Sequence, residues 1–261
     1  MRNVGESADY VCGEDAPSRQ QILALGDTLK LPMGTGLLVA ELAADAGPRW
    51  GELFQVTADD VITPNSELTK KGKPKKARLH IKIDWQIDSG AQAGENHRKP
   101  PKGNKRRKAA VGEVSITGYA LHVALLARVA QARQERVDGA NPEALLFPTE
   151  DGDLFFYTAF SNVYFRPAAI AANWPHQEWT HVGHRWNEAQ GTPSLVTEKR
   201  LQFDITWHSL RHRYARTCVD IRRLTASELM AHGGWDSGTV VKNLLYNVGE
   251  EHLDSGTEKF C

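Results

Sequence analysis

The stretch His208-Ser209-Leu210-Arg211-His212 stands at the start of a helix expected over residues 207–219. His208 and Arg211 lie three residues apart, so a helix presents both on one face. Gly234-Trp235-Asp236-Ser237 follows downstream, and Tyr246 lies in a further helix expected over 238–247. An imidazole, a guanidinium, an indole and a phenol in this order are the strongest sign of chemistry in the sequence.

Two further boxes precede this one. The first, Gly47-Pro48-Arg49-Trp50-Gly51-Glu52-Leu53, has a glutamate three residues after an arginine. The second, Pro101-Lys102-Gly103-Asn104-Lys105-Arg106-Arg107, is a basic turn between two expected strands. Each box alone has an ordinary explanation, because Arg49 and Glu52 could form a surface ion pair of little worth and a basic turn could simply be solvated. The order of all four boxes is what makes them specific.

The ordered set resembles the signature of the tyrosine recombinases, the phage-integrase family, over residues 47–248. In that family an arginine box comes first, a lysine-bearing hairpin turn second, an H-x-x-R box third, and a G-H or G-W step before a late tyrosine last. The resemblance implies the fold of the family's catalytic domain, which is mainly α with a small antiparallel β-sheet. It also implies an enzyme that acts on double-stranded DNA without a metal or another cofactor.

The implied reaction begins with attack of the Tyr246 hydroxyl on a DNA phosphodiester, which gives a 3′-phosphotyrosyl link and a free 5′-hydroxyl. Charge develops on the non-bridging oxygens of phosphorus in the transition state. Arg49 and Arg211 would hold those oxygens, because guanidinium groups are permanently charged and bind oxyanions in a forked geometry. The covalent intermediate conserves the energy of the broken bond, so rejoining needs no ATP.

The remaining implied roles fall on donors and an acid. His208 and Trp235 would donate hydrogen bonds to the phosphate, the indole through its N–H group. Lys102 would be the general acid that protonates the leaving 5′-oxygen. Glu52 would orient the site from a second layer, as the family's acidic residue does.

Three assignments have competitors. Lys102 matches the family turn best, but Lys99, Lys105 and Lys108 lie in the same basic run. His232 competes with Trp235, although it lies closer to Arg211 than the family spacing requires. Tyr246 follows Trp235 by eleven residues, a couple more than is usual in the family, and no other tyrosine follows Trp235.

The distribution of charge is compatible with a nucleic-acid partner or with a solvated basic loop, even though the formal net charge is zero. Residues 66–110 contain fourteen Lys and Arg against four Asp and Glu, and a concentrated basic segment can lie on a phosphate backbone. Besides the implied catalytic residues, we expect this segment to contact DNA through Lys99, Lys105, Arg106, Arg107 and Lys108. The family resemblance further suggests self-association into a tetramer on DNA.

Hydrophobic periodicity predicts a mostly helical domain. The expected helices cover residues 18–30, 35–46, 49–55, 117–136, 155–172, 207–219, 225–232 and 238–247. The expected strands cover 78–87, where Leu79, Ile81, Ile83, Trp85 and Ile87 share one face, and 105–115. We expect a mobile leader at 1–16 and a catalytic domain at 17–261 with an irregular insertion at 174–204, and the family's N-terminal core-binding domain to be absent.

Other features narrow the class of protein. The chain has an ordinary soluble composition, with 41% hydrophobic and 25% charged residues, and no apolar run or signal pattern indicates a membrane protein or a secreted one. Three scattered cysteines fit a reducing cytoplasm rather than a disulfide framework. His176, His181 and His184 lack additional metal ligands and are interpreted as loop residues, and Trp174, Trp179 and Trp186 as a packing cluster.

The leading hypothesis is a site-specific recombinase or integrase of a mobile element. One alternative is a non-catalytic DNA-binding protein, in which the long segment between Trp235 and Tyr246 misplaces the nucleophile. Another is an enzyme similar to the type IB topoisomerases, which share the tyrosine and arginine chemistry. The turn around Lys102 and the G-W step favour the integrase hypothesis.

Overall fold

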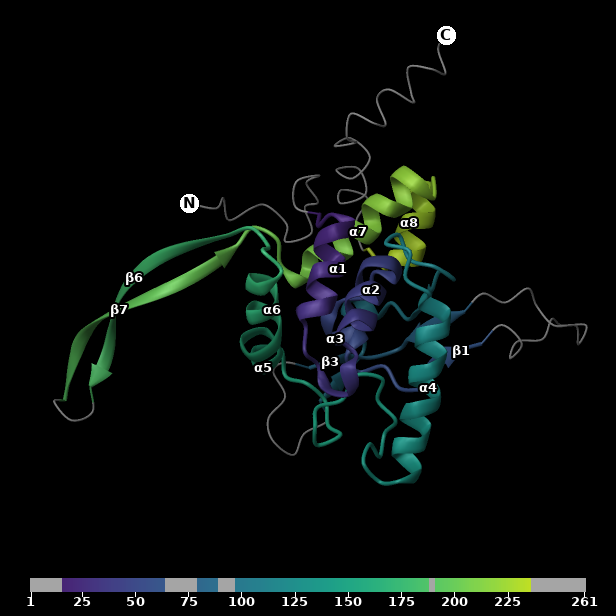
Figure 1. Cartoon of the computed structure of the whole chain (residues 1–261), viewed down its shortest axis with the longest axis horizontal. Coiled ribbons are helices and arrows are strands. Elements are labelled where there is room, and N and C mark those ends of the chain that lie inside the picture. The colour runs from purple at the N-terminus through teal and green to yellow at the C-terminus, as the bar shows by residue number, and fades with distance from the viewer. Residues whose placement is uncertain (1–15, 64–78, 89–96, 188–190, 236–261) are drawn as a thin grey trace, which may run out of the picture.

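The computed structural model describes residues 16–63, 79–88, 97–187 and 191–235, and Figure 1 shows a helical body from which a two-stranded β-ribbon projects. The helical elements are α1 (Arg19–Thr28), η2 (Pro32–Gly34), α2 (Gly36–Ala46), α3 (Trp50–Leu53), η3 (Lys102–Asn104), α4 (Leu121–Val137), α5 (Tyr157–Ala159), η4 (Phe160–Phe165), α6 (Arg166–Ala171), α7 (Trp207–Arg216), η5 (Thr217–Ile221) and α8 (Ala226–Gly233). The strands are β1 (Val61–Ile62), β2 (His80–Ile83), β3 (Gln86–Ile87), β4 (Arg98–Lys99), β5 (Arg107–Ala110), β6 (His176–Asn187) and β7 (Thr192–Phe203). The expected leader lies outside the described residues except for residue 16, and the expected helix at 238–247 lies wholly outside them.

The helix α2 lies at the centre of the body. It is buried almost all round, which requires other elements on every side, and α1, α4 and α7 pack against it. At the crossing with α1, a Cβ on Gly26 would lie 2.3 Å from Cδ1 of Leu37, so this close approach needs glycine. The packing fixes the end of α2 and therefore the position of the arginine box that follows it.

A three-stranded antiparallel sheet, β1-β2-β5, carries the basic turn. Its register pairs Ile81 with Val61 on one side and with Ala109 on the other. The predicted alternation is confirmed as far as Ile83, because Leu79, Ile81 and Ile83 are fully buried. It is wrong at Trp85, which is 40% exposed, since the chain leaves β2 there and begins the separate β3–β4 sheet.

An aromatic cluster joins α3, η4 and α7 beneath the arginine box. Phe160 lies with its ring 4.8 Å from that of Phe54 and 5.0 Å from that of Trp207. Edge and tilted contacts of this kind stabilise a core beyond the area they bury. The cluster holds the start of α3 and the start of α7 against each other.

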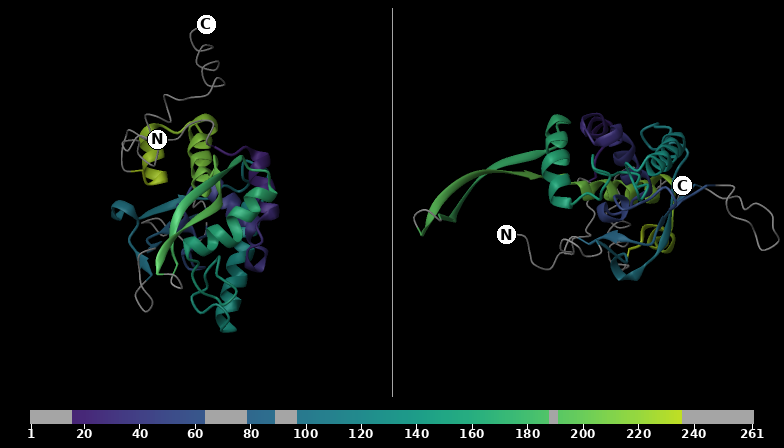
Figure 2. Two further views of the ribbon diagram at one scale, coloured as in Figure 1. Left: turned by 90° about the vertical axis from the view of Figure 1, so that its left-hand side faces the viewer. Right: turned by 90° about the horizontal axis from the view of Figure 1, so that it is seen from below.

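The prediction of an irregular insertion at 174–204 is wrong. Strands β6 and β7 pair continuously, from His176 with Phe203 to Asn187 with Thr192. Seen from below, the ribbon extends away from the helical body (Figure 2). Because most side chains on both faces of the ribbon are exposed, its sequence lacks the alternation that marks a half-buried strand.

The predicted tryptophan cluster is also wrong. Trp174 is 1% exposed and its indole donates to the carbonyl of Gln21 in α1 (3.0 Å). Trp179 and Trp186 lie along the ribbon and are 44% and 64% exposed. Only the first of the three tryptophans therefore belongs to the core.

The predicted helices within the described residues are confirmed, with small shifts at their ends. The predicted single helix at 155–172 contains a π-helical segment, η4, between α5 and α6. Nowhere in the described part of the chain is a helix long and apolar enough to span a membrane. The described fold is therefore mainly α with small antiparallel sheets, as predicted.

Candidate active site

Arg49 is presented at the junction between α2 and α3. Gly47 ends α2 in the left-handed conformation, with φ of 65°, and a Cβ there would lie 2.2 Å from the ring of Tyr214, so the turn requires glycine on both counts. The Glu52 carboxylate accepts the backbone N–H of Arg49 (2.7 Å) and caps α3. The same carboxylate accepts a hydrogen bond from Nη1 of Arg49 (3.1 Å).

Glu52 is fully buried and binds a second arginine. Arg107 of β5 donates to both of its oxygens, at 3.0 and 2.7 Å. Burial opposes ionisation of the carboxyl group, but the hydrogen bonds and charge of Arg107, with the charges of Arg211 and Arg49, outweigh it and lower the pKa of Glu52 to about 2. Glu52, Arg49, Arg107 and Arg211, here called the arginine cluster, therefore retain an excess of positive charge.

Arg211 lies on the buried side of α7 and is 2% exposed. Its Nη1 donates to the carbonyl of Gly47 (2.6 Å) and its Nη2 to that of Gly233 (2.7 Å). Burial and the nearby charge of Arg49 lower the pKa of Arg211 to about 9, so it stays protonated at neutral pH. Its buried Nε–H has no hydrogen-bond partner among the described residues.

The C-terminal end of α8 meets both predicted phosphate-binding arginines. Gly234 ends the helix with φ of 67°, and its carbonyl oxygen lies 3.4 Å from Nη2 of Arg49. The preceding carbonyl, that of Gly233, accepts from Arg211. Carbonyls at a helix C-terminus carry partial negative charge, so Arg49 and Arg211 converge on one electronegative end.

Trp235 covers the buried arginine. Its ring centroid lies 4.2 Å from Cζ of Arg211, and its other neighbour is the nearly parallel ring of Tyr214 (6.2 Å, 7°). A Cβ on Gly233 would lie 1.6 Å from the indole ring, so glycine permits this stack. Trp235 is 3% exposed and therefore closes one side of the arginine cluster.

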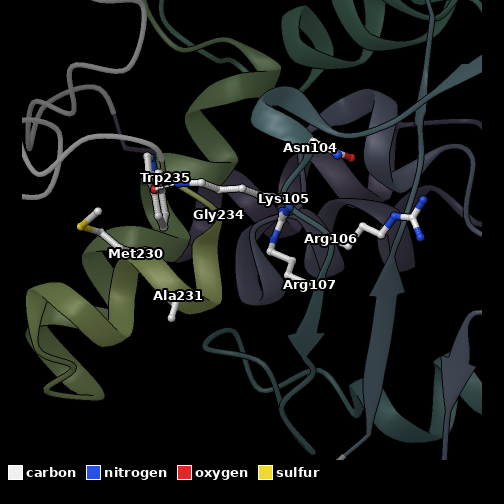
Figure 3. A pocket seen from close by; sticks show the side chains of 8 residues that line it. All are labelled: Asn104, Lys105, Arg106, Arg107, Met230, Ala231, Gly234 and Trp235. Carbon is white, nitrogen blue, oxygen red and sulfur yellow. Dashed lines mark hydrogen bonds between the residues drawn. The ribbon is translucent and has the colours of Figure 1, made fainter.

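A pocket of about 570 Å³ lies between the basic turn and α8 (Figure 3). We call it the turn pocket, and its lining includes Asn104, Lys105, Arg106, Arg107, Gly234 and Trp235. The described residues of the lining include three basic side chains, Lys105, Arg106 and Arg107, and no carboxylate. Figure 3 shows Lys105 extending across to Trp235, whose carbonyl lies 3.4 Å from its Nζ, whereas Arg106 points to the other side. The pocket suits an anion.

The other predicted catalytic residues are His208, Lys102 and Tyr246, of which the first two lie in the described part of the chain. His208, on the first turn of α7, is half-buried with its ring 5.1 Å from that of His212 in an edge contact. Lys102 is exposed in η3 and does not line the turn pocket, so Lys105 is the lysine of the turn that reaches Trp235. Tyr246 lies outside the described residues.

The predicted DNA contacts differ in how available they are. Lys99 pairs with Asp88 (2.8 Å) at the surface. Arg106 lies over the exposed ring of Trp85, with Cζ 5.6 Å from the centroid. Lys108 is exposed on β5. These residues remain predicted contacts to a phosphate backbone.

Arg107, predicted as a surface contact, is placed inside the arginine cluster. Its side chain is only 6% exposed. Strand periodicity could have indicated this, because Arg107 and the buried Ala109 share one face of β5. The inward face of β5 therefore delivers a third guanidinium that the motif alone did not assign.

A second ion pair, between buried Asp45 and the partly exposed Arg222, was not foreseen. Asp45, near the end of α2, accepts from Nη2 of Arg222 in the turn after η5 (2.5 Å) and from the backbone of Gly112 (3.0 Å). The pair ties the end of α2, just before the arginine box, to the C-terminal helices. No sequence signal could have found it, because 177 residues separate the partners and neither lies in a motif.

The three ribbon histidines do not gather. The ring Nδ1 of His176 lies 2.7 Å from the carbonyl of Trp174, while His181 lies opposite Glu198 and His184 opposite Leu195. Across the described residues, no group of three or more His, Cys, Asp or Glu side chains could hold a metal ion.

No family model matches the sequence, and no curated protein matches it significantly. The structure is similar to that of the XerH site-specific recombinase bound to its difH substrate before cleavage, with a TM-score of 0.52, 14% identity and coverage of 94% of this chain. It is also similar to the Tn1549 transposon integrase in complex with transposon right end DNA, with a TM-score of 0.53, 14% identity and coverage of 100% of this chain and 67% of the integrase. The chain spans 52% of the length of XerH. It has the fold of the tyrosine recombinase catalytic domain.

Proposed function

We propose that the chain cleaves and rejoins DNA strands, with Tyr246 as the nucleophile. The observation that supports this best is the convergence of Arg49 and Arg211, which contact the adjacent carbonyls of Gly234 (3.4 Å) and Gly233 (2.7 Å). Two guanidinium groups this close can bind one phosphate together. Conversely, guanidinium groups facing separate pockets would have been incompatible with a shared phosphate.

The arginine cluster suits the charge that develops in the reaction. The Tyr246 hydroxyl gives up its proton as its oxygen bonds to phosphorus, and the 5′-oxygen leaves with the electron pair of the broken P–O bond and takes up a proton. Negative charge rises on the non-bridging oxygens between these events. Arg49, which Glu52 holds in place beforehand, can stabilise that charge without reorganising.

Entry of the phosphate requires a local change beside Arg211. Arg49 is accessible, with 16% side-chain exposure, whereas Arg211 is covered by Trp235. We therefore propose that the phosphate first binds Arg49 in place of the Gly234 carbonyl and then displaces the Gly233 carbonyl or the indole ring from Arg211. His208 at the start of α7 and the Trp235 N–H would supply further hydrogen bonds.

The general acid is Lys102 by its match to the family turn, with Lys105 as the competitor that already reaches Trp235 (3.4 Å). A substrate with sulfur in place of the bridging 5′-oxygen separates them, because a thiolate leaves without protonation. Cleavage of this substrate should be near normal for the variant that lacks the acid and for wild type. We expect rescue of Lys102→Ala and none of Arg49→Ala, whose defect lies at the non-bridging oxygens.

A nicked suicide duplex tests the enzymatic proposal directly. Loss of the short strand after attack prevents rejoining, so the covalent protein–DNA adduct accumulates. We expect an adduct with wild type, none with Tyr246→Phe, and at least a hundredfold slower formation with Arg49→Ala, in the range of a lost oxyanion contact. Absence of any adduct, with duplex binding intact, would support the non-catalytic alternative.

The topoisomerase alternative makes a different prediction. A type IB activity would relax supercoiled plasmid that carries no specific site, whereas a site-specific enzyme would not. The DNA-bound state also tests assembly, because the proposed enzyme should bind double-stranded DNA and associate into a tetramer there. Sedimentation of the protein with and without its junction DNA measures that association.

A further inference from the structure

A second pocket, of about 710 Å³, lies where the β6–β7 ribbon joins the helical body. We call it the root pocket. Its walls come from α5, η4 and α6 on one side and from the base of the ribbon on the other. Among the described residues, Arg166, Lys199 and Arg200 line it, and no carboxylate does.

The cations of the root pocket are available for exchange with a ligand. Lys199 pairs with Glu178 and Arg200 with Glu198, each at 3.3 Å. All four side chains are between 45% and 76% exposed, and exposed pairs of this kind are weak. Neither glutamate is among the described residues that line the pocket, so a phosphate inside it would replace Glu178 and Glu198 as the partner of the two cations.

Aromatic and neutral polar groups complete the lining. Trp179 and Tyr157 are 44% and 46% exposed, and Cζ of Arg200 lies 5.9 Å from the Trp179 ring. Exposed aromatic rings beside cations are the pattern that binds nucleic-acid strands, because the cations bind the backbone and the rings stack on bases or sugars. Gln202 and Thr206 add side-chain donors of the kind that contact phosphates.

The root pocket lies next to the proposed cleavage site. Thr206 is the N-cap of α7, which carries His208 two residues later. On the other wall, Tyr157 packs edge-on against Trp50 (5.1 Å, 77°), the neighbour of Arg49 in the arginine box. Both walls are therefore continuous with elements that carry the predicted phosphate-binding residues.

We propose that the root pocket binds DNA backbone phosphates that lie beside the phosphate at which the strand is cleaved. The proposal rests on the proposed function in one respect, that the ligand is DNA. It assigns Arg166, Lys199 and Arg200 to strand binding, and it gives the ribbon root a role separate from the chemistry at Tyr246.

The salt dependence of binding tests the assignment. The probe is a fluorescent DNA duplex of random sequence, long enough to extend past the ribbon on both sides of the proposed cleavage site. It is bound to the full chain carrying Tyr246→Phe. Each phosphate contact contributes roughly 0.9 to the slope of log affinity against log salt. The double variant Arg166→Gln/Arg200→Gln should therefore reduce the slope by about 1.8. The matched control is Arg133→Gln/Arg136→Gln on α4, two exposed arginines away from the ribbon, which should leave the slope unchanged.

Cross-linking distinguishes a DNA strand from a free nucleotide. A benzophenone amino acid in place of Gln202, which lines the pocket and is exposed, should cross-link to the labelled duplex and not to labelled deoxyadenosine monophosphate. Cross-linking to the mononucleotide alone, or an unchanged salt slope in the double variant, would overturn the proposal. Neither measurement requires cleavage, so a protein that fails the adduct assay can still pass both.

Discussion

The three-stranded β1-β2-β5 sheet and the β6–β7 ribbon hold arginines in opposite ways. On β5, the Arg107 side chain is 6% exposed and bound by both oxygens of the buried Glu52. On β7, the Arg200 side chain is 47% exposed and meets Glu198 at 3.3 Å on the surface. An arginine is therefore a fixed part of the interior on β5 and an adjustable surface group on β7.

This difference matches two kinds of work on a phosphate chain. Stabilising the charge of a transition state needs guanidinium groups that are already in place, and in the proposed reaction the arginine cluster would provide them. Holding the neighbouring backbone needs charges that can adapt to it and release counterions, and the root pocket provides those. Burial, rather than residue type, separates the two roles.

The largest contrast is expected when each arginine loses its carboxylate partner. Glu52→Gln leaves Arg49, Arg107 and Arg211 without their shared negative charge, and removal of one partner from a buried ion pair typically costs about 3–5 kcal/mol. The matched surface variant, Glu198→Gln, should change the free energy of unfolding by less than about 0.5 kcal/mol. Urea denaturation at pH 7 measures both.

Equal effects of Glu52→Gln and Glu198→Gln would contradict the contrast. If Glu52→Gln does not fold, Glu52→Asp provides a milder test of the buried ion pairs, because aspartate keeps the negative charge on a shorter side chain. We expect Glu52→Asp to be less destabilised than Glu52→Gln at pH 7.

Acid should expose the same contrast through titration. The pKa of Glu52 is lowered from 4.5 to about 2 in the folded chain. A carboxyl group with a depressed folded pKa contributes stability above its unfolded pKa, and this contribution is lost as the pH falls from about 4.5 through 2. For this shift the contribution is on the order of 3 kcal/mol. The slope of unfolding free energy against pH in that window should be smaller in Glu52→Gln, and an unchanged slope would contradict the assigned cause.

The predictable parts of the molecule are those with a local pattern. The boxes around Arg49 and Arg211 stand next to a glycine turn and a helix start that the sequence displays, and α2 shows its apolar stripe. The β6–β7 ribbon was missed because neither of its faces is buried, so no alternation of apolar and polar residues marked the two strands that backbone pairing forms. Arg107 was misplaced for a related reason: its charge suggested the surface, while its position on β5 directs it inward.

A smaller contrast is expected when the charge is kept and only the geometry is changed. Arg107→Lys loses one of two hydrogen bonds to Glu52, because an ammonium group cannot reproduce the planar fork. The expected loss is about 1–3 kcal/mol of unfolding free energy. Arg200→Lys should stay within about 0.5 kcal/mol. A tolerated lysine at 107, with adduct formation as fast as wild type, would show that the fork is dispensable.

Removing most of the ribbon should change stability less than either substitution in the arginine cluster does. Residues 181–198 can be replaced by Asn-Gly, because Thr180 and Lys199 pair across the ribbon and a two-residue turn of this sequence closes a hairpin. The root-pocket residues Trp179 and Arg200 remain. A two-stranded ribbon that stands away from the body contributes little to its core, so unfolding free energy should change by less than about 1 kcal/mol. Because the root pocket stays intact, the slope of log affinity for DNA against log salt should also persist. A large drop in the unfolding free energy or in this slope would contradict the prediction and indicate that the distal ribbon makes a contact of its own.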